Sequence, residues 1–308
     1  MLSFKIMRSF AHLLLLGTTA LAHDYPPGGD CVLAHPELYR GEENPEVVCR
    51  QRPAPAGAIR VACIGDSITA VGHTSNVSHH WPNQLQDILD AKHGAGKFSV
   101  TNLGVCGSTL QHEGKKPWWK TGAHAAFVAA QWDIVFVMLG TNDAAPTAQG
   151  YWPASNHAHC DAATASTLSS CNFASTYQEL LDVIAAQGPD ASTPPTTTIM
   201  IPPPLMENGA YNMNQTIINT IYPQLIPLIA TANKVGLLSV YTGMGGVPAP
   251  MWQTEMPPMC NLTNFKTWPP CRWYCDAQSC APGQCHPNDV GCAHLAEVVY
   301  GGCRLCGW

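Results

Sequence analysis

The chain has 308 residues, a length that fits one large α/β domain or two small ones and is enough for a sizeable core. Charged residues make up only 12% and the formal net charge is -6, so the composition offers no basic surface for nucleic acid or an anionic membrane. Beyond the N-terminal segment, no apolar run reaches the ~18 residues of a membrane span. We expect a soluble mature protein.

The first 22 residues have the pattern of a secretory signal peptide. Lys5 and Arg8 precede an apolar run of leucines, and Ala20 and Ala22 frame a small-residue cleavage site. A buried N-terminal helix is the alternative. We therefore expect residues 1–22 to be removed and the protein to be secreted.

Fourteen cysteines suit an oxidising compartment. Eight of them fall in the last 49 residues: Cys260, Cys271, Cys275, Cys280, Cys285, Cys292, Cys303 and Cys306. A zinc knuckle and a redox pair are the alternatives, but oxidation competes for the thiolates that zinc needs. We expect disulfides here, and neither a metal nor a cofactor. Three sequons supply glycan acceptors for a eukaryotic secretory pathway: Asn76, Asn214 and Asn261.

Short apolar runs alternate with segments of helical periodicity along most of the chain. Residues 23–58, rich in proline and glycine with little periodicity, form an irregular lead-in. We predict five buried strands. The first starts at Val61, and the others span 99–105, 134–139, 196–201 and 235–240. Helices are predicted near 81–93, 123–131, 177–184, 217–229 and 290–300, with a long loop over 144–174. Pro223 or Pro227 starts or kinks the fourth helix.

Strands that alternate with helices predict a parallel sheet covered on both faces. We expect one three-layer α/β/α domain, flavodoxin-like in class, with about five strands and spanning residues 23–308. Its last part, 243–308, is rich in proline and cysteine and is expected to be a disulfide-rich segment.

Polar clusters follow two of the predicted strands. The first strand ends in Gly65-Asp66-Ser67, and the third ends in Gly140-Thr141-Asn142-Asp143. Ligands of open α/β sheets bind outside the carboxyl ends of the strands, so these clusters occupy a place where chemistry is done. Capping of the next helix by Asp66 and Ser67 is the alternative. We expect Asp66 and Asp143 to be hydrogen-bonded parts of the turns.

Two further fragments, Asn102-Leu103-Gly104 and Cys285-His286-Pro287-Asn288-Asp289, complete a set of four blocks. Together they resemble the four sequence blocks of the GDSL, or SGNH, hydrolase family over most of the mature chain. The resemblance implies a secreted GDSL-type esterase with Ser67 as the nucleophile and His286 as its base. It also implies three oxyanion donors: the backbone N–H of Ser67, the backbone N–H of Gly104 and the side chain of Asn142.

One position departs from the family pattern. Members usually carry an aspartate three residues before the histidine, to orient the imidazole, whereas this chain has Gly283. Asp276, Asp289 and a backbone carbonyl are the candidates for this role, and Asp289 is better placed to cap the closing helix. Loss of the aspartate weakens an enzyme of this type without abolishing its activity.

Trp118, Trp119 and Trp152 follow the second and third blocks. They either line the pocket mouth, where they would stack on sugar rings, or pack as ordinary core side chains. We expect a secreted serine esterase that hydrolyses O-acetyl or short-acyl esters of carbohydrates or small molecules. The alternative is an SGNH-fold protein that has lost efficient catalysis and binds carbohydrate or has a structural role. The oligomeric state stays open.

Overall fold

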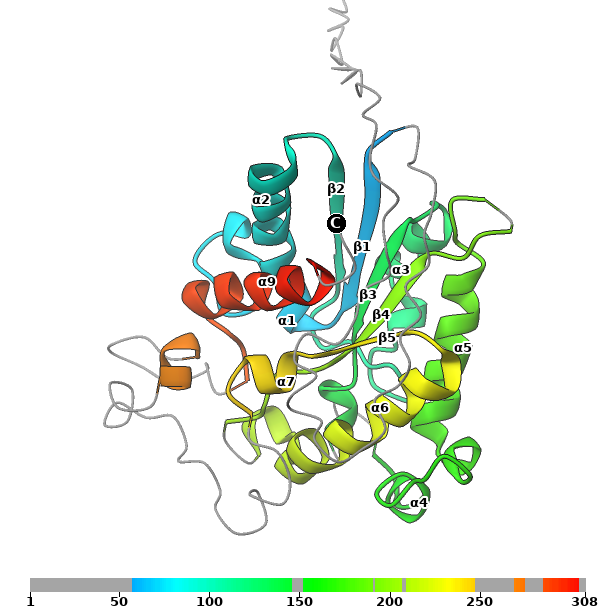
Figure 1. Ribbon diagram of the computed structural model, residues 1–308. Helices are drawn as coiled ribbons and strands as arrows, with labels where there is room; N and C mark the ends of the chain where they lie inside the picture. The colour runs from blue at the N-terminus through cyan, green and yellow to red at the C-terminus, as the bar shows by residue number, and fades with distance from the viewer. Residues whose placement is uncertain are drawn as a thin grey trace, which may run out of the picture.

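Five buried strands form one parallel sheet in the order β2-β1-β3-β4-β5 in the computed structural model of the protein (Figure 1). The strands are β1 (Ile59–Gly65), β2 (Phe98–Gly104), β3 (Ile134–Met138), β4 (Thr196–Ile201) and β5 (Gly236–Ser239). Each lies where a strand was predicted, to within a few residues. The predicted parallel sheet is therefore confirmed.

The structure describes residues 57–145, 152–190, 192–206, 209–246, 269–274 and 285–304. Several expectations concern residues outside these ranges. They concern the signal peptide at 1–22 and the lead-in at 23–58, of which only residues 57 and 58 are described. They also concern the sequon at Asn261, the candidate Asp276 and four of the late cysteines: Cys260, Cys275, Cys280 and Cys306. These expectations stay predictions.

The strand register aligns the carboxyl ends of the three strands nearest the site. Gly65 at the end of β1 is paired with Gly104 of β2 on one side and with Met138 of β3 on the other. Because the strands are parallel, the loops that follow them leave the sheet at the same edge. The residues after β1, β2 and β3 therefore meet, although they are far apart in the sequence.

Helices cover both faces of the sheet (Figure 1). On one face, α2 and α9 pack against strand side chains that include Val61 and Phe136. On the other, α3, α5 and α6 cover side chains that include Ile64 and Val137. Alternate residues of each strand thus enter opposite cores, as expected for a sheet buried on both sides. The predicted three-layer α/β/α fold is confirmed.

The α-helices are α1 (Ser67–Ala70), α2 (Trp81–His93), α3 (Gly122–Val128), α4 (Ala154–His159), α5 (Asn172–Ala185), α6 (Tyr222–Asn233), α7 (Val240–Gly243) and α9 (Asp289–Arg304). The short helices are η2 (Val77–His79), η3 (Trp118–Lys120), η4 (Asn142–Ala144), η5 (Leu168–Ser170), η6 (Ala210–Asn212), η7 (Ile217–Ile221) and η8 (Pro269–Trp273). Helix α2 ends at Gly94, whose φ of 95° suits glycine. In the predicted helix at 217–229, η7 is a π-helical turn and α6 follows, with Pro223 in its first turn and Pro227 inside.

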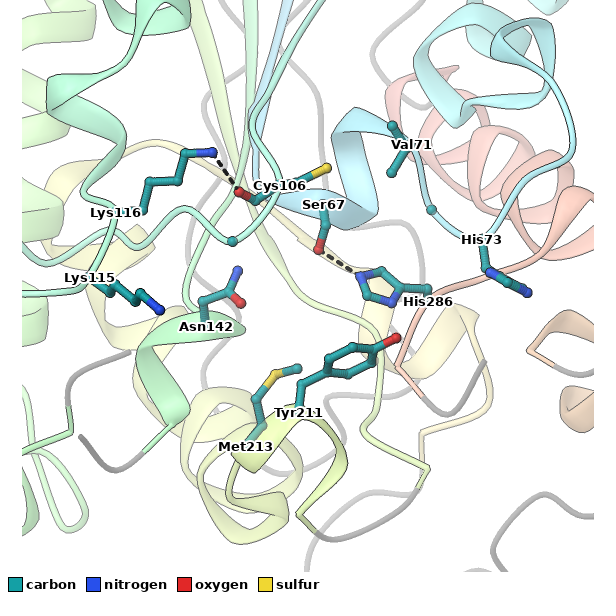
Figure 2. A pocket seen from close by; sticks show the side chains of 12 residues that line it. Ser67, Val71, His73, Cys106, Lys115, Lys116, Asn142, Tyr211, Met213 and His286 are labelled. Carbon is teal, nitrogen blue, oxygen red and sulfur yellow. Dashed lines mark hydrogen bonds between the residues drawn. The ribbon is translucent and has the colours of Figure 1, made fainter. Parts of the chain in front are cut away.

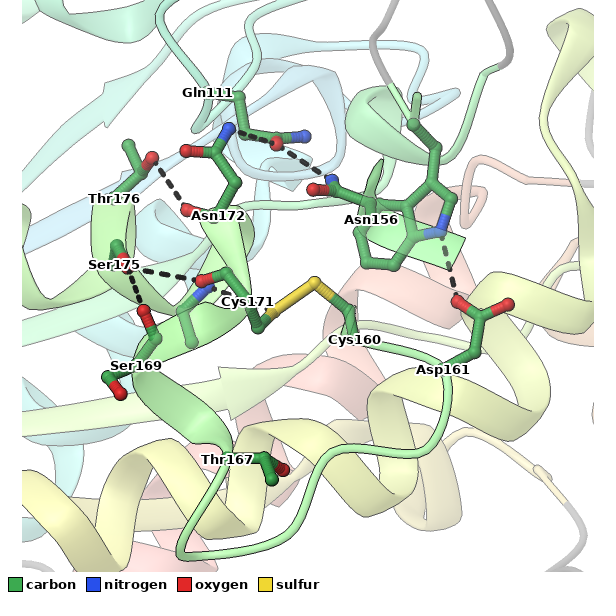
Figure 3. Close-up of a disulfide and its surroundings, with 12 residues drawn as sticks. Gln111, Asn156, Cys160, Asp161, Thr167, Ser169, Cys171, Asn172, Ser175 and Thr176 are labelled. Carbon is green, nitrogen blue, oxygen red and sulfur yellow. Dashed lines mark hydrogen bonds between the residues drawn. A yellow bond between two sulfur atoms is a disulfide. The ribbon is translucent and has the colours of Figure 1, made fainter. Parts of the chain in front are cut away.

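The predicted loop at 144–174 contains more structure than expected. Its described part includes α4 and η5, and a disulfide joins Cys160 to Cys171 (Figure 3). Cys171 also precedes α5, and its sulfur accepts a hydrogen bond from the N–H of Ala174 at 3.4 Å. Periodicity could not reveal this segment because α4 and η5 are too short to produce a hydrophobic repeat.

A buried glutamine connects this disulfide-bonded segment to the loop that follows β2. The side-chain oxygen of Gln111 accepts hydrogen bonds from the amides of Asn156 at 2.8 Å and Asn172 at 3.2 Å (Figure 3). The backbone N–H of Gln111 donates to Asp143 at 2.8 Å. The disulfide-bonded segment is therefore connected through Gln111 to the loops that form one wall of the site described below.

Disulfides were expected among the late cysteines, but two of the described ones do not form them. Cys271 is disulfide-bonded. Cys285 and Cys292 carry free, buried thiols, and burial raises the pKa of Cys292 to about 12. Both pack as small apolar side chains, Cys285 in one core and Cys292 in the other.

The structure describes two of the three sequons. Asn76 is exposed, and its side chain accepts from the N–H of Ser78 at the start of η2. Asn214 is half-buried, and its side chain accepts from the N–H of Thr216. Glycosylation of these sites stays a prediction. None of the helices in the described ranges has the length and apolar character needed to cross a membrane.

Candidate active site

Ser67 stands at the turn between strand β1 and helix α1. Asp66 caps this short helix through a hydrogen bond from the N–H of Ile68 to its Oδ1 at 2.9 Å. Gly65 is required for close packing, because a Cβ on it would lie 2.1 Å from Oγ1 of Thr69. The capping alternative therefore describes Asp66, whereas the hydroxyl of Ser67 faces a pocket.

The nearest partner of the serine is His286. The Oγ of Ser67 lies 2.7 Å from Nε2 of His286, although the two residues are 219 positions apart in the sequence (Figure 2). The N–H of His73 donates to the carbonyl of Pro287 at 2.7 Å and so ties the chain after α1 to the residue that follows the histidine. Tyr211 packs edge-on against the imidazole, with ring centroids 5.1 Å apart. These contacts fix the imidazole beside the serine hydroxyl.

The second nitrogen of His286 has no carboxylate partner within the described residues. Its Nδ1 lies 3.8 Å from Sγ of Cys285, which is long for a strong hydrogen bond. Asp289 points elsewhere, because it accepts from the backbone N–H and hydroxyl of Ser75 at 2.8 Å and 2.6 Å. Asp289 is the first residue of α9, but Asn288 caps this helix, because its Oδ1 accepts from the N–H of Gly291 at 3.0 Å. The expected cap by Asp289 is therefore wrong.

Burial and, to a smaller extent, charge repulsion by the nearby His73 lower the pKa of His286 to about 4. The imidazole is therefore neutral at neutral pH. A neutral Nε2 beside a hydroxyl can accept its proton, which is the state that a general base needs.

Asn142 begins the short helix η4 directly after β3 and lines the same pocket. Its Nδ2 donates one hydrogen bond to the carbonyl of Ser108 at 3.0 Å. Because a side-chain amide has two N–H groups, the second remains for a group in the pocket.

The structure does not bring Gly104 to the pocket. Its N–H donates to the side-chain oxygen of Asn102 at 3.0 Å, and a Cβ on it would lie 2.3 Å from the backbone N of Ala70. Gly104 thus allows β2 to pack closely against α1. The expectation that its N–H faces an oxyanion is therefore wrong.

Gly107, three residues later, lies at the pocket where the sequence had led us to expect Gly104. It lines the pocket with Ser67 and Asn142 and has a φ of 75°. The backbone N–H groups of Ser67 and Gly107 donate to no acceptor in the described part of the chain. Sequence reasoning missed Gly107 because its place depends on a four-residue turn, which only the backbone conformation reveals.

Two buried carboxylates lie behind the site. Asp143 accepts from the N–H groups of Leu110 and Gln111, and Asp66 caps α1, so both are hydrogen-bonded parts of the turns, as predicted. Burial raises the pKa of Asp66 to about 7 and that of Asp143 to about 6. The hydrogen bonds of Asp143 join the loop after β3 to the loop after β2.

The pocket has a volume of about 580 Å³. Besides the groups above, its lining includes His73, Lys115, Lys116 and Met213. The tryptophans are absent from this lining within the described residues. Trp118 and Trp152 are buried in the core, and Trp119 donates its indole N–H to the carbonyl of Leu110 at 2.6 Å. The expectation that Trp118 and Trp152 line the pocket is wrong, and the core-packing alternative holds for them.

Residues 63–293 match the sequence model of the GDSL-like lipase/acylhydrolase family. This match spans most of the chain, and the chain belongs to that family. The resemblance seen in the four sequence blocks is confirmed. The description of this family agrees with the predicted class, a hydrolase that acts on ester bonds.

An acetylxylan esterase of Xylanibacter ruminicola is 42% identical over 96 residues, which are 30% of this chain and 19% of that protein. Two solved structures share the fold at low identity. A proposed arylesterase from Agrobacterium tumefaciens is 20% identical with a TM-score of 0.50, covering 80% of this chain and 99% of that one. A proposed GDSL-like lipase from Parabacteroides merdae is 14% identical with a TM-score of 0.50, covering 81% of this chain and 97% of that one.

Proposed function

We propose that the protein is a serine esterase that hydrolyses carboxylic esters through an acyl-enzyme formed on Ser67. The observation that carries this proposal is the 2.7 Å contact between the Oγ of Ser67 and Nε2 of His286 at the wall of an open pocket. A serine hydroxyl is a weak nucleophile by itself, and a neutral imidazole within hydrogen-bond distance activates it.

In the first half of the reaction, the Oγ of Ser67 attacks the ester carbonyl while its proton passes to Nε2 of His286. The carbonyl oxygen becomes negative in the tetrahedral intermediate. The intermediate collapses, the alcohol leaves with the proton from His286, and the acyl group stays on Ser67. Water then attacks this acyl group while His286 accepts a proton from it. As the second intermediate collapses, His286 returns this proton to the Oγ of Ser67 and the carboxylic acid leaves.

Three N–H groups would stabilise the oxyanion. They are the backbone N–H of Ser67, the backbone N–H of Gly107 and the free N–H of the Asn142 amide. Their support is that all three residues line one pocket and that the described chain supplies no other acceptor for the two backbone groups. Fixed donors of this kind stabilise the intermediate without reorganising during the reaction.

The substrates proposed are O-acetyl or short-acyl esters, including those on carbohydrate. The local similarity to an acetylxylan esterase supports this class. The pocket lining includes Lys115 and Lys116, whose ammonium groups can donate hydrogen bonds to a hydroxyl-rich leaving group. The signal-peptide pattern at 1–22 supports an extracellular place of action.

Within the described residues His286 has no carboxylate partner, which favours a second candidate, a protein that keeps the fold and binds acetylated carbohydrate with little turnover. The two are separated by p-nitrophenyl acetate hydrolysis with Ser67→Ala as the control. Turnover that depends on Ser67 supports the esterase. Equal rates for the wild type and Ser67→Ala, with retained binding of acetylated xylan, support the binding protein.

A further inference from the structure

The loop after β2 turns sharply at the peptide bond between Cys106 and Gly107. The N–H of Ser108 donates to the carbonyl of Val105 at 3.0 Å, which closes a four-residue turn. Gly107 is the third residue of this turn and has a φ of 75°. Cys106, the second residue, is not among the residues with a positive φ. A positive φ at the third position alone is typical of a type II turn.

Type I and type II turns differ by a rotation of about 180° of their central peptide group. Here that group consists of the carbonyl of Cys106 and the N–H of Gly107. In a trans peptide the two bonds point in opposite directions, so the direction of the carbonyl fixes the direction of the N–H. A rotation to type I would therefore point the Gly107 N–H away from the pocket.

The carbonyl of Cys106 has a charged partner. The Nζ of Lys116 donates to this carbonyl at 3.1 Å (Figure 2). A hydrogen bond from an ammonium group is stronger than one between neutral groups, and it also polarises the peptide that accepts it. The ammonium favours the orientation in which the Cys106 carbonyl faces Lys116 and the Gly107 N–H faces the opposite way.

The backbone of Lys116 is itself held in place. The N–H of Thr109 donates to the carbonyl of Lys116 at 3.0 Å, and the N–H of Trp118 donates to the carbonyl of Thr109 at 2.9 Å. Trp118 is buried, and its indole N–H donates to the carbonyl of Leu103 at 3.0 Å. The side chain of Lys116 is exposed, but its backbone is thus held in place beside Cys106.

We propose that Lys116 is a positioning residue that holds the Cys106–Gly107 peptide in the orientation that presents the Gly107 N–H to the oxyanion. This inference rests on the proposed esterase function. Lys116 does not touch the substrate in this role. It acts through the peptide group that does.

The test compares Lys116→Met with Lys116→Arg, using p-nitrophenyl acetate. Loss of a charge-assisted hydrogen bond is expected to lower kcat of Lys116→Met by about 10-fold, with KM changed less than about twofold. Lys116→Arg keeps a cationic donor and should recover most of the rate. A boronic acid, which forms a tetrahedral adduct on a serine, should bind Lys116→Met more weakly by the same factor as the loss in kcat.

Two lysines serve as controls. Lys120→Met removes an exposed charge at the end of η3 and should keep the wild-type kcat. Lys115→Met removes a charge from the pocket wall without touching the Cys106 carbonyl and should cost less than Lys116→Met. The proposal is overturned by a wild-type kcat in Lys116→Met, by an equal loss in Lys115→Met, or by unchanged boronic acid affinity. If the wild type is no faster than Ser67→Ala, the esterase function itself fails, which is a separate result.

Discussion

The side-chain amide of Asn142 donates to the carbonyl of Ser108 at 3.0 Å. This bond joins the end of β3 to the loop that follows β2. It fixes the amide plane, so the remaining N–H of Asn142 is held toward the pocket before any substrate enters. A donor that is already oriented stabilises developing charge more effectively than one that must first rotate.

Replacement of Asn142 by alanine should lower kcat by ~10² to 10³, the scale seen when a single oxyanion donor is removed from a serine hydrolase. Steady-state kinetics on a short-acyl ester measure this loss. Circular dichroism checks that the fold persists, which we expect because Asn142 is only partly buried. Wild-type turnover in a folded Asn142→Ala protein would show that the amide is not an oxyanion donor.

The activity should rise with pH at the pKa of His286 and then level off. Burial lowers this pKa to about 4, so kcat/KM should reach its plateau below the ordinary histidine value of ~6.5. His73 repels the protonated imidazole, so His73→Gln should move the acid limb to higher pH. A midpoint at or above ~6.5 in the wild type would contradict the observed environment of His286.

The residue that orients the imidazole of His286 can be sought by mutation. Among the described residues, the only group near its Nδ1 is the distant thiol of Cys285. We expect Asp276→Asn to change kcat by less than about tenfold and His286→Ala to remove nearly all activity. Both are measured with the same ester, alongside their unfolding temperatures. A loss on the order of 10³ in a folded Asp276→Asn protein would identify Asp276 as the missing acid.

The sequence was most informative where structure is local. A strand buried on both faces is a continuous apolar run, so β1 and β3 and the polar residues at their ends were visible directly. Since parallel strands end at one edge of the sheet, the meeting of Ser67 with Asn142 also followed from the pattern.

Features that depend on backbone conformation or on distant contacts were not visible. Gly104 and Gly107 are alike in the sequence, and only the close approach of α1 to one and the positive φ of the other separate their roles. Trp152 resembled a binding residue because it lies in a long loop, but α5 and α6 supply aromatic rings that pack around it. The pairing of Cys160 with Cys171 could not be chosen from fourteen cysteines.

Removal of that disulfide should destabilise the protein. The bond closes a loop between residues separated by 11 positions. The chain-entropy model gives a loss of about 3 kcal/mol for the double variant with serine at both positions. Denaturant unfolding under non-reducing conditions measures the loss. An unchanged free energy of unfolding in the double variant would show that the loop is held by its hydrogen bonds to Gln111 instead.

Asp66 should make the protein less stable as the pH rises toward neutrality. Burial raises its pKa from 3.8 to about 7, so the folded protein keeps a proton that the unfolded chain releases. A group whose pKa is raised on folding contributes stability that is complete below its unfolded pKa and is lost as the pH rises through its folded pKa. The pH window is therefore from about 4 to about 7.

Asp66→Asn removes this titration while keeping an oxygen that can accept from the N–H of Ile68. Its amide also places a donor where the Oδ2 of Asp66 is buried without a hydrogen-bond partner. The variant should therefore gain stability relative to the wild type as the pH rises from about 4 to about 8. Denaturant unfolding of both proteins across this range measures the difference. The titration of His286 affects the stability of both proteins equally and therefore cancels in this difference. A difference that stays constant with pH, or that favours the wild type more at higher pH, would mean that Asp66 is ionised in the folded protein throughout.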